Sequence, residues 1–199
     1  MLERGLKVNH TTVYRWVQAY APELEKRCRP QLKSTNDSWR VDETYISVKG
    51  KWKYLYRAVD SAGNTIDFLL SAKRNRQAAK RFFRKALKAT HTSSPRVINV
   101  DKNAAYPTAI DELKTEKLVT QACELRQNKY LNNIVEQDHR LIKRLVNPGL
   151  GFKSFYTARR TISGYETMNM IRKGQINRVS KGDIIGQVNF IADIFGVVA

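Results

Sequence analysis

The fold is constrained most by a change of hydrophobic period near residue 73. Before this point, residues 39–48, 53–60 and 65–72 are rich in β-branched and aromatic side chains and are separated by short turns. Three strands joined by short turns predict an antiparallel meander. After it, the apolar residues of 75–90 recur on one helical face. Residues 96–100 (RVINV) then form a short apolar run that is typical of a buried strand.

The rest of the chain continues the alternation of helix and strand. Residues 103–114 are expected to form a helix broken by Pro107, and residues 117–122 a fifth strand. Residues 132–146 and 156–173 are expected to form two further helices. The order β-β-β-α-β-α-β-α-α predicts an α/β protein, with a mixed five-stranded sheet flanked by helices.

An amphipathic helix is expected ahead of the sheet. In residues 10–27, apolar side chains recur at positions i, i+3, i+4 and i+7. Thr11 or Thr12 is the expected cap, and Pro22 is expected to interrupt the helix. The apolar side chains of this pattern are Val13, Trp16, Val17 and Tyr20.

The charge of the chain indicates a polyanionic partner. Lys and Arg number 36 against 18 for Asp and Glu, which gives a net charge of +18 in 199 residues. The basic residues are spread along the chain, so they predict a broad contact with nucleic-acid phosphates rather than a basic tail. Cys28 and Cys123 belong to no metal-binding or disulfide pattern, which fits a reducing cytoplasm. No apolar run is long enough to predict a transmembrane helix.

Three carboxylates stand at points where the predicted elements would bring them together. Asp42 lies in the first strand, Asp101 directly follows the buried strand, and Glu136 lies in the first turns of the helix 132–146. Carboxylates that converge on Mg²⁺ or Mn²⁺, most effectively on two ions, support attack on a phosphodiester. The predicted site is therefore a metal-binding triad.

Two other acidic residues compete for a place in this site. Glu43 neighbours Asp42, but successive strand residues face opposite sides, so only one of the two can face the site. Asp60 stands at a turn, where Asp commonly binds its own backbone. We favour Asp42. Each of the three triad residues taken alone has an ordinary structural explanation, as a strand-end residue, a turn former or an ion-pair partner.

The helix around Glu136 adds a basic stripe. Glu136, His139, Arg140 and Lys143 fall at i, i+3, i+4 and i+7. An ion pair between Glu136 and Arg140 would explain part of this spacing. The alternative is that Arg140 and Lys143 bind DNA phosphate beside the metal, with His139 as a further DNA contact. The residues expected to face the core are Ile134, Val135, Leu141, Ile142 and Leu145.

Four runs of residues resemble the DDE transposases of bacterial insertion sequences. They are VDETYI (41–46), NVDKNAAYP (99–107), NNIVEQDHRLIKR (132–144) and GFKSFYTARRTISGYETMNMIRKGQ (151–175). The pattern is most similar to the insertion-sequence-six family and extends over nearly all of residues 10–175. The run at 151–175, with its GYE and KGQ segments, is the most specific to that family.

The resemblance implies a ribonuclease-H-like core in which Asp42, Asp101 and Glu136 hold Mg²⁺ or Mn²⁺. It also implies that Lys143, seven residues after Glu136, contacts DNA. The implied reaction nicks the element ends to free 3′-hydroxyls, which then attack target DNA. The implied partners are DNA, as terminal inverted repeats and target, and further copies of the chain in a homodimer or higher oligomer. The implied location of this reaction is the bacterial cytoplasm, at the nucleoid.

The start of the chain departs from the family pattern. Residues 1–28 resemble the second helix of a helix-turn-helix domain that reads the inverted repeats, so we expect a partial, loosely docked module. Residues 29–38 would link it to a catalytic domain at 39–175, and residues 176–199 would form a tail. The candidate DNA contacts of the first helix are Thr11, Thr12, Tyr14, Arg15 and Gln18.

Two other functions fit the same sequence. A ribonuclease-H-like nuclease would hydrolyse DNA with the same triad but would not join strands. A DNA-binding remnant without catalytic activity would keep the basic surface alone. The triad does not separate the nuclease from the transposase, because both use the same metal chemistry.

Overall fold

The computed structural model describes residues 5, 7–128 and 133–197, and its sheet has five strands as predicted. The strands are β1 (Ser38–Val48), β2 (Lys51–Asp60), β3 (Thr65–Ser71), β4 (Val97–Val100) and β5 (Glu124–Gln127). The helices are α1 (His10–Cys28), α2 (Arg76–Lys88), α3 (Ala105–Thr115), α4 (Asn133–Val146), α5 (Phe155–Arg172) and α6 (Ile184–Phe195). Asn132, the predicted first residue of the fourth helix, lies outside the described residues. None of the helices described is both long and apolar enough to cross a membrane.

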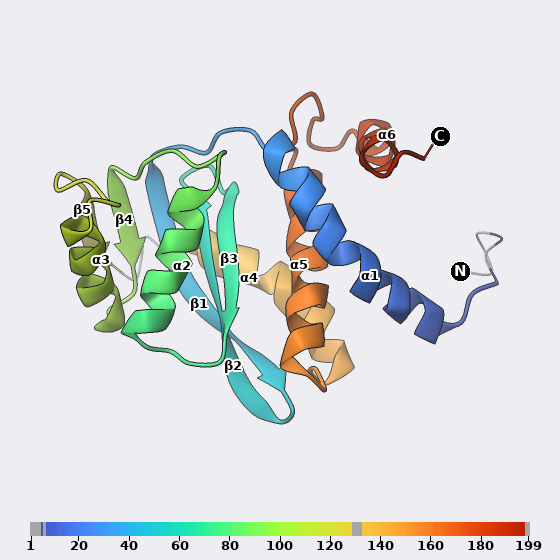
Figure 1. Cartoon of the computed structure of the whole chain (residues 1–199), viewed down its shortest axis with the longest axis horizontal. Coiled ribbons are helices and arrows are strands. Elements are labelled where there is room, and N and C mark those ends of the chain that lie inside the picture. Colours follow the sequence, from blue (N-terminus) through green and yellow to red (C-terminus); the bar gives the residue numbers. More distant parts are fainter. Residues whose placement is uncertain (1–4, 6, 129–132, 198–199) are drawn as a thin grey trace.

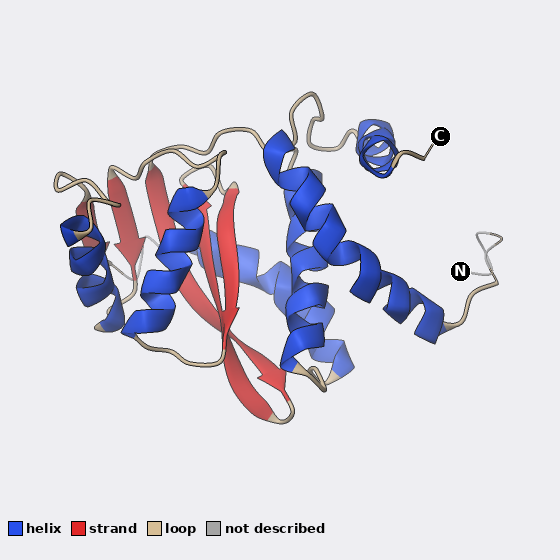
Figure 2. Ribbon diagram, in the orientation of Figure 1, coloured by secondary structure: helices blue, strands red, loops and turns tan. Residues whose placement is uncertain are grey.

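The sheet order is β3-β2-β1-β4-β5, which places β1 at its centre (Figures 1 and 2). The first three strands pair antiparallel as the predicted meander, and β4 and β5 continue the sheet in parallel. Parallel pairing requires a crossover, which α2 supplies between β3 and β4 and α3 supplies between β4 and β5.

Two hydrophobic cores lie on the two faces of the sheet. On one face, the aromatic side chains of α2 and α3 pack against the odd-numbered residues of β1, such as Trp39 and Val41. On the other face, α4, α5 and the end of α1 cover even-numbered residues such as Ile46 and Val48. Because side chains alternate along a strand, Asp42 and Glu43 belong to different faces.

Two predicted helix breaks are wrong. Pro107 is the third residue of α3, where the missing N–H has no helical partner to lose. Pro22 lies inside α1, which continues without interruption. Proline at this position leaves the carbonyl of Gln18 without its helical donor, and the Nε of Arg160 in α5 donates to that oxygen at 2.5 Å. The contact between α1 and α5 therefore satisfies the group that Pro22 frees.

The predicted fifth strand at 117–122 is also wrong, because this segment closes α3. The backbone N–H groups of Leu118 and Val119 both donate to the carbonyl of Leu113, at 2.9 and 3.3 Å. Residues bonded back to the helix cannot pair with β4. The strand forms two residues later, where Glu124 lies opposite Val97.

The N-terminal helix begins at His10, as predicted, but its cap is neither Thr11 nor Thr12. Asn9 is the cap of α1, and its side chain accepts a hydrogen bond from the backbone N–H of Thr11 at 3.0 Å. The helix packs along α5, with Ala21, Leu24 and Cys28 buried. Its first half is more open: Trp16 is 43% exposed and Tyr20 is 56% exposed, on an apolar groove between α1, α5 and α6.

The segment after α1 is a packed connection. Leu32 is buried and forms a bridge with Ile176, beyond the end of α5. The backbone N–H of Thr35 donates to the carbonyl of His91 at 2.9 Å. Residues 29–37 therefore run along the body of the protein, held by backbone hydrogen bonds.

Candidate functional site

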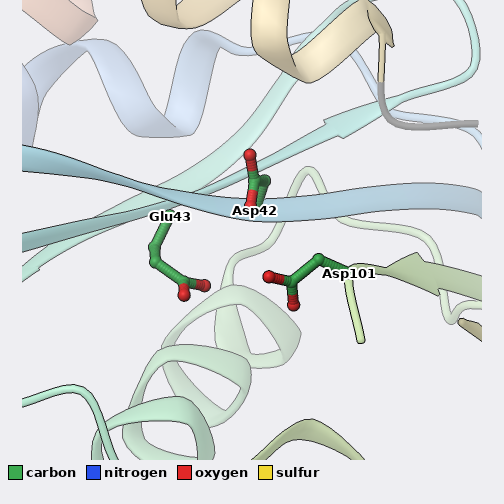
Figure 3. A group of neighbouring side chains, drawn as sticks. All are labelled: Asp42, Glu43 and Asp101. Carbon is green, nitrogen blue, oxygen red and sulfur yellow. The ribbon is translucent and has the colours of Figure 1, made fainter. Parts of the chain in front are cut away.

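The site is built on the centre of the sheet, where β1 and β4 run parallel. Asp42 lies in the middle of β1 on the face covered by α4, and Asp101 follows the last residue of β4. Figure 3 shows Asp42 and Glu43 leaving β1 on opposite sides, with Asp101 beside them. Oxygen atoms of these three carboxylates lie within 4.8 Å of one another. Arg40 lies opposite Asn99 in this parallel pair, so Asp42 and Asp101 stand at the same level of the sheet and come together as expected from the sequence.

The negative charge of this group is not fully compensated. Burial, followed by the neighbouring charges of Glu43, Asp101 and Glu136, raises the pKa of Asp42 to about 7. A carboxyl with such a pKa is protonated in much of the population at neutral pH. A bound cation would remove this repulsion, so the donor set fits a divalent metal.

Glu136 approaches the group from α4. It lies in the first turn of the helix with an exposed side chain, and its charge contributes to the raised pKa of Asp42. Among the described residues, the group whose oxygens lie within 4.8 Å contains Glu43 and not Glu136. The structure thus brings Asp42 and Asp101 together and places Glu136 near them on the facing helix.

Glu43 is committed to hydrogen bonds on the opposite face of β1. Its side chain is 1% exposed and accepts hydrogen bonds from the hydroxyl of Tyr106 and from the Nε of Arg74. Asn103 donates a third hydrogen bond to it at 3.3 Å. A carboxylate that accepts three donors is fixed in orientation, so Glu43 anchors the residues around Asp101.

Arg74 is the residue that the sequence reasoning missed. It stands between β3 and α2, and its Nη2 lies 3.3 Å from Asp101 while its Nε binds Glu43. The guanidinium thus supplies positive charge to two of the clustered carboxylates. The sequence offered no signal for this role, because Arg74 stands among many basic residues and belongs to none of the four runs that resemble the family.

The predicted stripe on α4 is wrong for His139. The buried residues of α4 are Val135, His139, Ile142 and Val146, so the helix turns His139 toward the sheet. Its Nδ1 lies 3.8 Å from the carboxylate of Asp42. Burial, together with the charges of Arg57 and Lys143, lowers the pKa of His139 to about 3. His139 is therefore a buried, neutral neighbour of Asp42 and does not belong to the exposed stripe of α4.

The apolar residues of α4 follow from this rotation. Val135 and Ile142 are buried as predicted, whereas Ile134 is 36% exposed and Leu145 is 41% exposed. The helix buries the face that carries His139, so Ile134 and Leu145 lie on the exposed side of that face. Arg140 and Lys143 remain exposed on the same helix as Glu136.

A buried network of charges fixes α4 against β2 and α5. Arg57 is the β2 partner of Asp42 and is fully buried. Its guanidinium binds both carboxylate oxygens of Glu166 in α5, at 2.6 and 2.8 Å, and binds Asp138 in α4 at 2.6 Å. Lys173 also binds Asp138, at 2.7 Å. Burial alone would raise the pKa of Asp138, but Arg57 and Lys173 outweigh it and hold that pKa below its usual value.

The candidate DNA contacts of α1 divide into two groups. Thr11, Tyr14 and Arg15 are exposed, and Thr12 is half-buried. Gln18 instead faces α5, where its Nε2 donates to the hydroxyl of Thr161 at 2.8 Å. This contact explains Gln18 as a packing residue between the two helices.

The chain is similar to known proteins of one family. A family model described as the DDE domain matches residues 36–175. The transposase for insertion sequence-like element IS431mec of Staphylococcus aureus (strain Mu50) is 38% identical to the chain. That alignment covers 86% of this chain and 74% of the relative. The transposase for insertion sequence element IS257 in transposon Tn4003 of Staphylococcus aureus is also 38% identical, over 85% of this chain and 73% of the relative.

A solved structure resembles the sheet and its helices. The catalytic core domain of HTLV-2 integrase, in a trimeric complex with magnesium, aligns with a TM-score of 0.52 and 18% sequence identity. The alignment covers 75% of this chain and 93% of that one. This likeness shows the fold, which is the ribonuclease-H-like fold that the family resemblance implied. The family model and the two transposases place the chain in the insertion-sequence-six family of bacterial DDE transposases.

Proposed function

We propose that Asp42, Asp101 and Glu136 together hold the divalent metal with which this transposase cuts and joins DNA. The observation that carries the proposal is the gathering of carboxylates, since oxygens of Asp42, Glu43 and Asp101 lie within 4.8 Å of one another. In support, burial and the charges of Glu43, Asp101 and Glu136 raise the pKa of Asp42. Only hard oxygen donors are present in the group, as Mg²⁺ and Mn²⁺ prefer. Glu43 is excluded from the ligand set because its oxygens are already bound by three side-chain donors.

The metal, most effectively as two ions, would activate the attacking oxygen and stabilise charge on the leaving oxygen. The chain's own residues perform the remaining work. His139 packs beneath Asp42 as a neutral group and limits the movement of that carboxylate. Lys143 and Arg140 are exposed beside Glu136 and would bind the phosphates that flank the scissile bond.

The reaction that we propose has two steps at this one site. Water first attacks the phosphodiester at an element end, and the P–O bond breaks to leave a free 3′-hydroxyl. That hydroxyl then attacks a phosphodiester of target DNA: its proton leaves as the new P–O bond forms, and the target's own P–O bond breaks to release a 3′-hydroxyl of the target strand. The partners are terminal inverted repeats, target DNA and at least one further copy of the chain, at the nucleoid of a bacterial cytoplasm. Thr11, Thr12, Tyr14 and Arg15 of α1 are the proposed contacts to the inverted repeats.

A strand-transfer assay with pre-cut 3′-hydroxyl ends tests this proposal. We expect Asp101→Asn and Glu136→Gln each to lower joining by more than about 100-fold, because each removes a metal ligand. Glu43→Gln is the matched control, since it changes a neighbouring carboxylate that we place outside the ligand set. A greater loss in Glu43→Gln than in Glu136→Gln would contradict the assignment. Hydrolysis without joining in the wild type would favour the nuclease alternative.

A further inference from the structure

A hollow of about 370 Å³ opens between the tip of the β1–β2 hairpin and the start of α5, which Figure 1 shows side by side. Three lysines of the hairpin, Lys49, Lys51 and Lys53, line one side of it, and Ser154, Phe155 and Tyr156 line the other. We call it the lysine hollow. The N–H of Lys49 donates to the carbonyl of Phe152 at 2.7 Å, and the N–H of Phe152 donates to the carbonyl of Ser47 at 2.9 Å. These two hydrogen bonds fix the hairpin tip against the segment that leads into α5.

The lysine hollow lies on the face of the sheet that carries Asp42. Lys53 is the β1 partner of Ile46, and Lys51 is the partner of Val48. Residues directly opposite one another in an antiparallel pair point to the same face. Ile46 and Val48 belong to the core that α4 and α5 cover, so Lys51 and Lys53 point to that face as well.

The charge of the lysine hollow is left uncompensated by the chain itself. The two segments that form the hollow contain no Asp or Glu between residues 44 and 59 or between residues 139 and 165. In the part of the chain that the structure describes, the ammonium groups of the three hairpin lysines form no ion pair. By contrast, Lys85 binds Asp67 at 2.9 Å and Lys173 binds Asp138 at 2.7 Å. The hairpin lysines are therefore available to an anion from outside the chain.

The start of α5 adds hydrogen-bond donors to the lysine hollow. Ser154 is the N-cap residue of α5, but its side chain accepts no hydrogen bond from the first turn, which also contains no acidic residue. The N–H groups at such a helix start favour a negative charge. The hydroxyl of Tyr156 accepts a hydrogen bond from the Nη1 of Arg160 at 2.6 Å, which leaves its own hydrogen for donation. Lysines and neutral donors together match the charged oxygens of a phosphodiester.

The position of the lysine hollow fits a DNA backbone that also reaches the clustered carboxylates. Ile46 and Val48 follow Asp42 in β1 by four and six residues, which corresponds to about 14–20 Å along the strand. Successive phosphates of one DNA strand are about 3.4 Å apart along the duplex axis. The hollow therefore lies about four to six nucleotides from the metal site. Arg140 and Lys143 are exposed on α4, on the same face of the sheet.

We infer that the lysine hollow binds the phosphate backbone of the DNA that lies across the metal site, about four to six nucleotides from the bond that reacts. This inference rests on the proposed function in one respect, that the substrate is DNA. The contacts are made to phosphates, so they position the duplex without reading its sequence. The hollow gives the duplex a second point of attachment, beyond the basic residues of α4.

Binding of a duplex of arbitrary sequence to the full chain, measured by fluorescence anisotropy at several salt concentrations, tests the inference. Lys51→Ala should lower the affinity about fivefold and reduce the slope of log affinity against log salt concentration by about one, because it removes one phosphate contact. Lys51→Arg keeps the charge and should bind as the wild type does. Lys88→Ala is the matched control, since Lys88 is equally exposed but lies on α2, on the opposite face of the sheet. It should leave both the affinity and the slope unchanged.

A disulfide cross-link locates the contact. Cys28 and Cys123 are buried, so Lys51→Cys introduces an exposed thiol at the lysine hollow. A duplex with a thiol tether on one phosphate should cross-link to Lys51→Cys at least about tenfold more efficiently than to Lys88→Cys, because only the former lies against the backbone. The cross-link should persist when Asp101→Asn is added. Its persistence there supports the lysine hollow even if the assignment of the metal site fails.

The inference would be overturned if the double variant Lys51→Ala/Lys53→Ala bound the duplex with the affinity and salt dependence of the wild type. The proposed function would be untouched by that result, whereas a wild type that binds no duplex at all would contradict both. Loss of DNA binding together with dissociation to monomers in sedimentation would also overturn the inference, because the hollow would then be a contact between copies of the chain. Weaker binding at an unchanged melting temperature and an unchanged oligomeric state confirms it.

Discussion

Arg57 in β2 binds Asp138 in α4 at 2.6 Å, two residues beyond Glu136 along the chain. The same guanidinium is held by Glu166 of α5, in the GYE segment that is most specific to the family. The buried guanidinium of Arg57 thus fixes the position of α4 relative to the sheet. This contact explains how Glu136, which α4 carries, keeps its place near Asp42.

Asp138→Asn should therefore weaken metal binding without touching a proposed ligand. The substitution removes the negative charge that Arg57 and Lys173 share, and we expect a loss of stability of about 3 kcal/mol. The first turn of α4 would then be less well placed, and the affinity for Mn²⁺ should fall about tenfold. Electron paramagnetic resonance of free Mn²⁺ measures that affinity directly.

The matched control is Asp67→Asn. Asp67 is also buried and paired, with Arg29 at 2.8 Å and Lys85 at 2.9 Å, but it lies in β3 away from the carboxylates. It should lower stability by a similar amount and leave Mn²⁺ affinity unchanged. Equal losses of Mn²⁺ affinity in the two variants would show that Asp138 acts only through general stability. In a Glu136→Gln background, Asp138→Asn should have no additional effect on that affinity.

Asp42→Asn should stabilise the metal-free protein at alkaline pH. The folded-state pKa of Asp42, about 7, lies above its ordinary value of 3.8, so the folded chain binds this proton more tightly than the unfolded chain. Its contribution to stability is therefore fully present below about pH 4 and is lost as the pH rises through 7. Relative to wild type, the melting temperature of Asp42→Asn should rise by about 5 °C at pH 8 and change little at pH 4.

Thermal unfolding in EDTA across this pH range checks the expectation. Added Mn²⁺ should raise the melting temperature of the wild type at pH 8 and should have little effect on Asp42→Asn. A difference between the two proteins that does not change with pH would refute the electrostatic explanation.

Arg74→Ala should make the protein more dependent on metal for its stability. Arg74 supplies positive charge to Glu43 and Asp101, so its removal leaves the carboxylates to repel one another. Because Arg74 is partly exposed, we expect a modest fall of about 2 °C in the metal-free melting temperature. Saturating Mn²⁺ should recover most of that loss. Arg84→Ala, which breaks an exposed pair with Glu116, serves as the control, and Mn²⁺ should recover nothing there.

Gly164→Ala should loosen α1 from α5. A Cβ atom at Gly164 would lie 2.8 Å from the Cβ of Ala21, closer than side-chain carbons approach. The helices would have to separate, which should increase hydrogen exchange in α1 and lower stability by about 1–3 kcal/mol. Adding Ala21→Gly should restore the close approach at a helix-propensity cost of about 1 kcal/mol. If the double variant does not restore the protection of α1 against hydrogen exchange, the contact between Gly164 and Ala21 is not what holds the two helices together.

The elements with a clear hydrophobic period could be predicted from the sequence. The meander, α2 and β4 have local patterns that their packing reinforces, and the DDE resemblance supplied the arrangement around them. The expected interruption at Pro22 failed because Arg160, distant in sequence, supplies the hydrogen bond that proline removes. The expected strand at 117–122 failed because its backbone bonds to the end of α3, which no periodicity reveals.

The candidate site divides in the same way. Asp42 and Asp101 could be placed near one another from the order of the predicted elements together with the family resemblance. The orientation of α4 could not, because helical periodicity gave two plausible stripes and His139 was assigned to the outer one. Burial of His139 depends on tertiary contacts with Asp42 and the sheet. Arg74 was missed since its role arises only from spatial proximity to Glu43.

The strand order has a consequence for the time at which the site is formed. The meander joins neighbours in sequence, whereas β4 joins β1 by pairing Val97 with Ser38 across two strands and a helix. Closing the longer loop costs more chain entropy, so we expect the meander to form first and the parallel pair later. Pulse-labelling hydrogen exchange during refolding would show protection of β2 ahead of β4. Asp42 and Asp101 meet only at that later stage, so a partly folded chain cannot assemble the metal site on DNA.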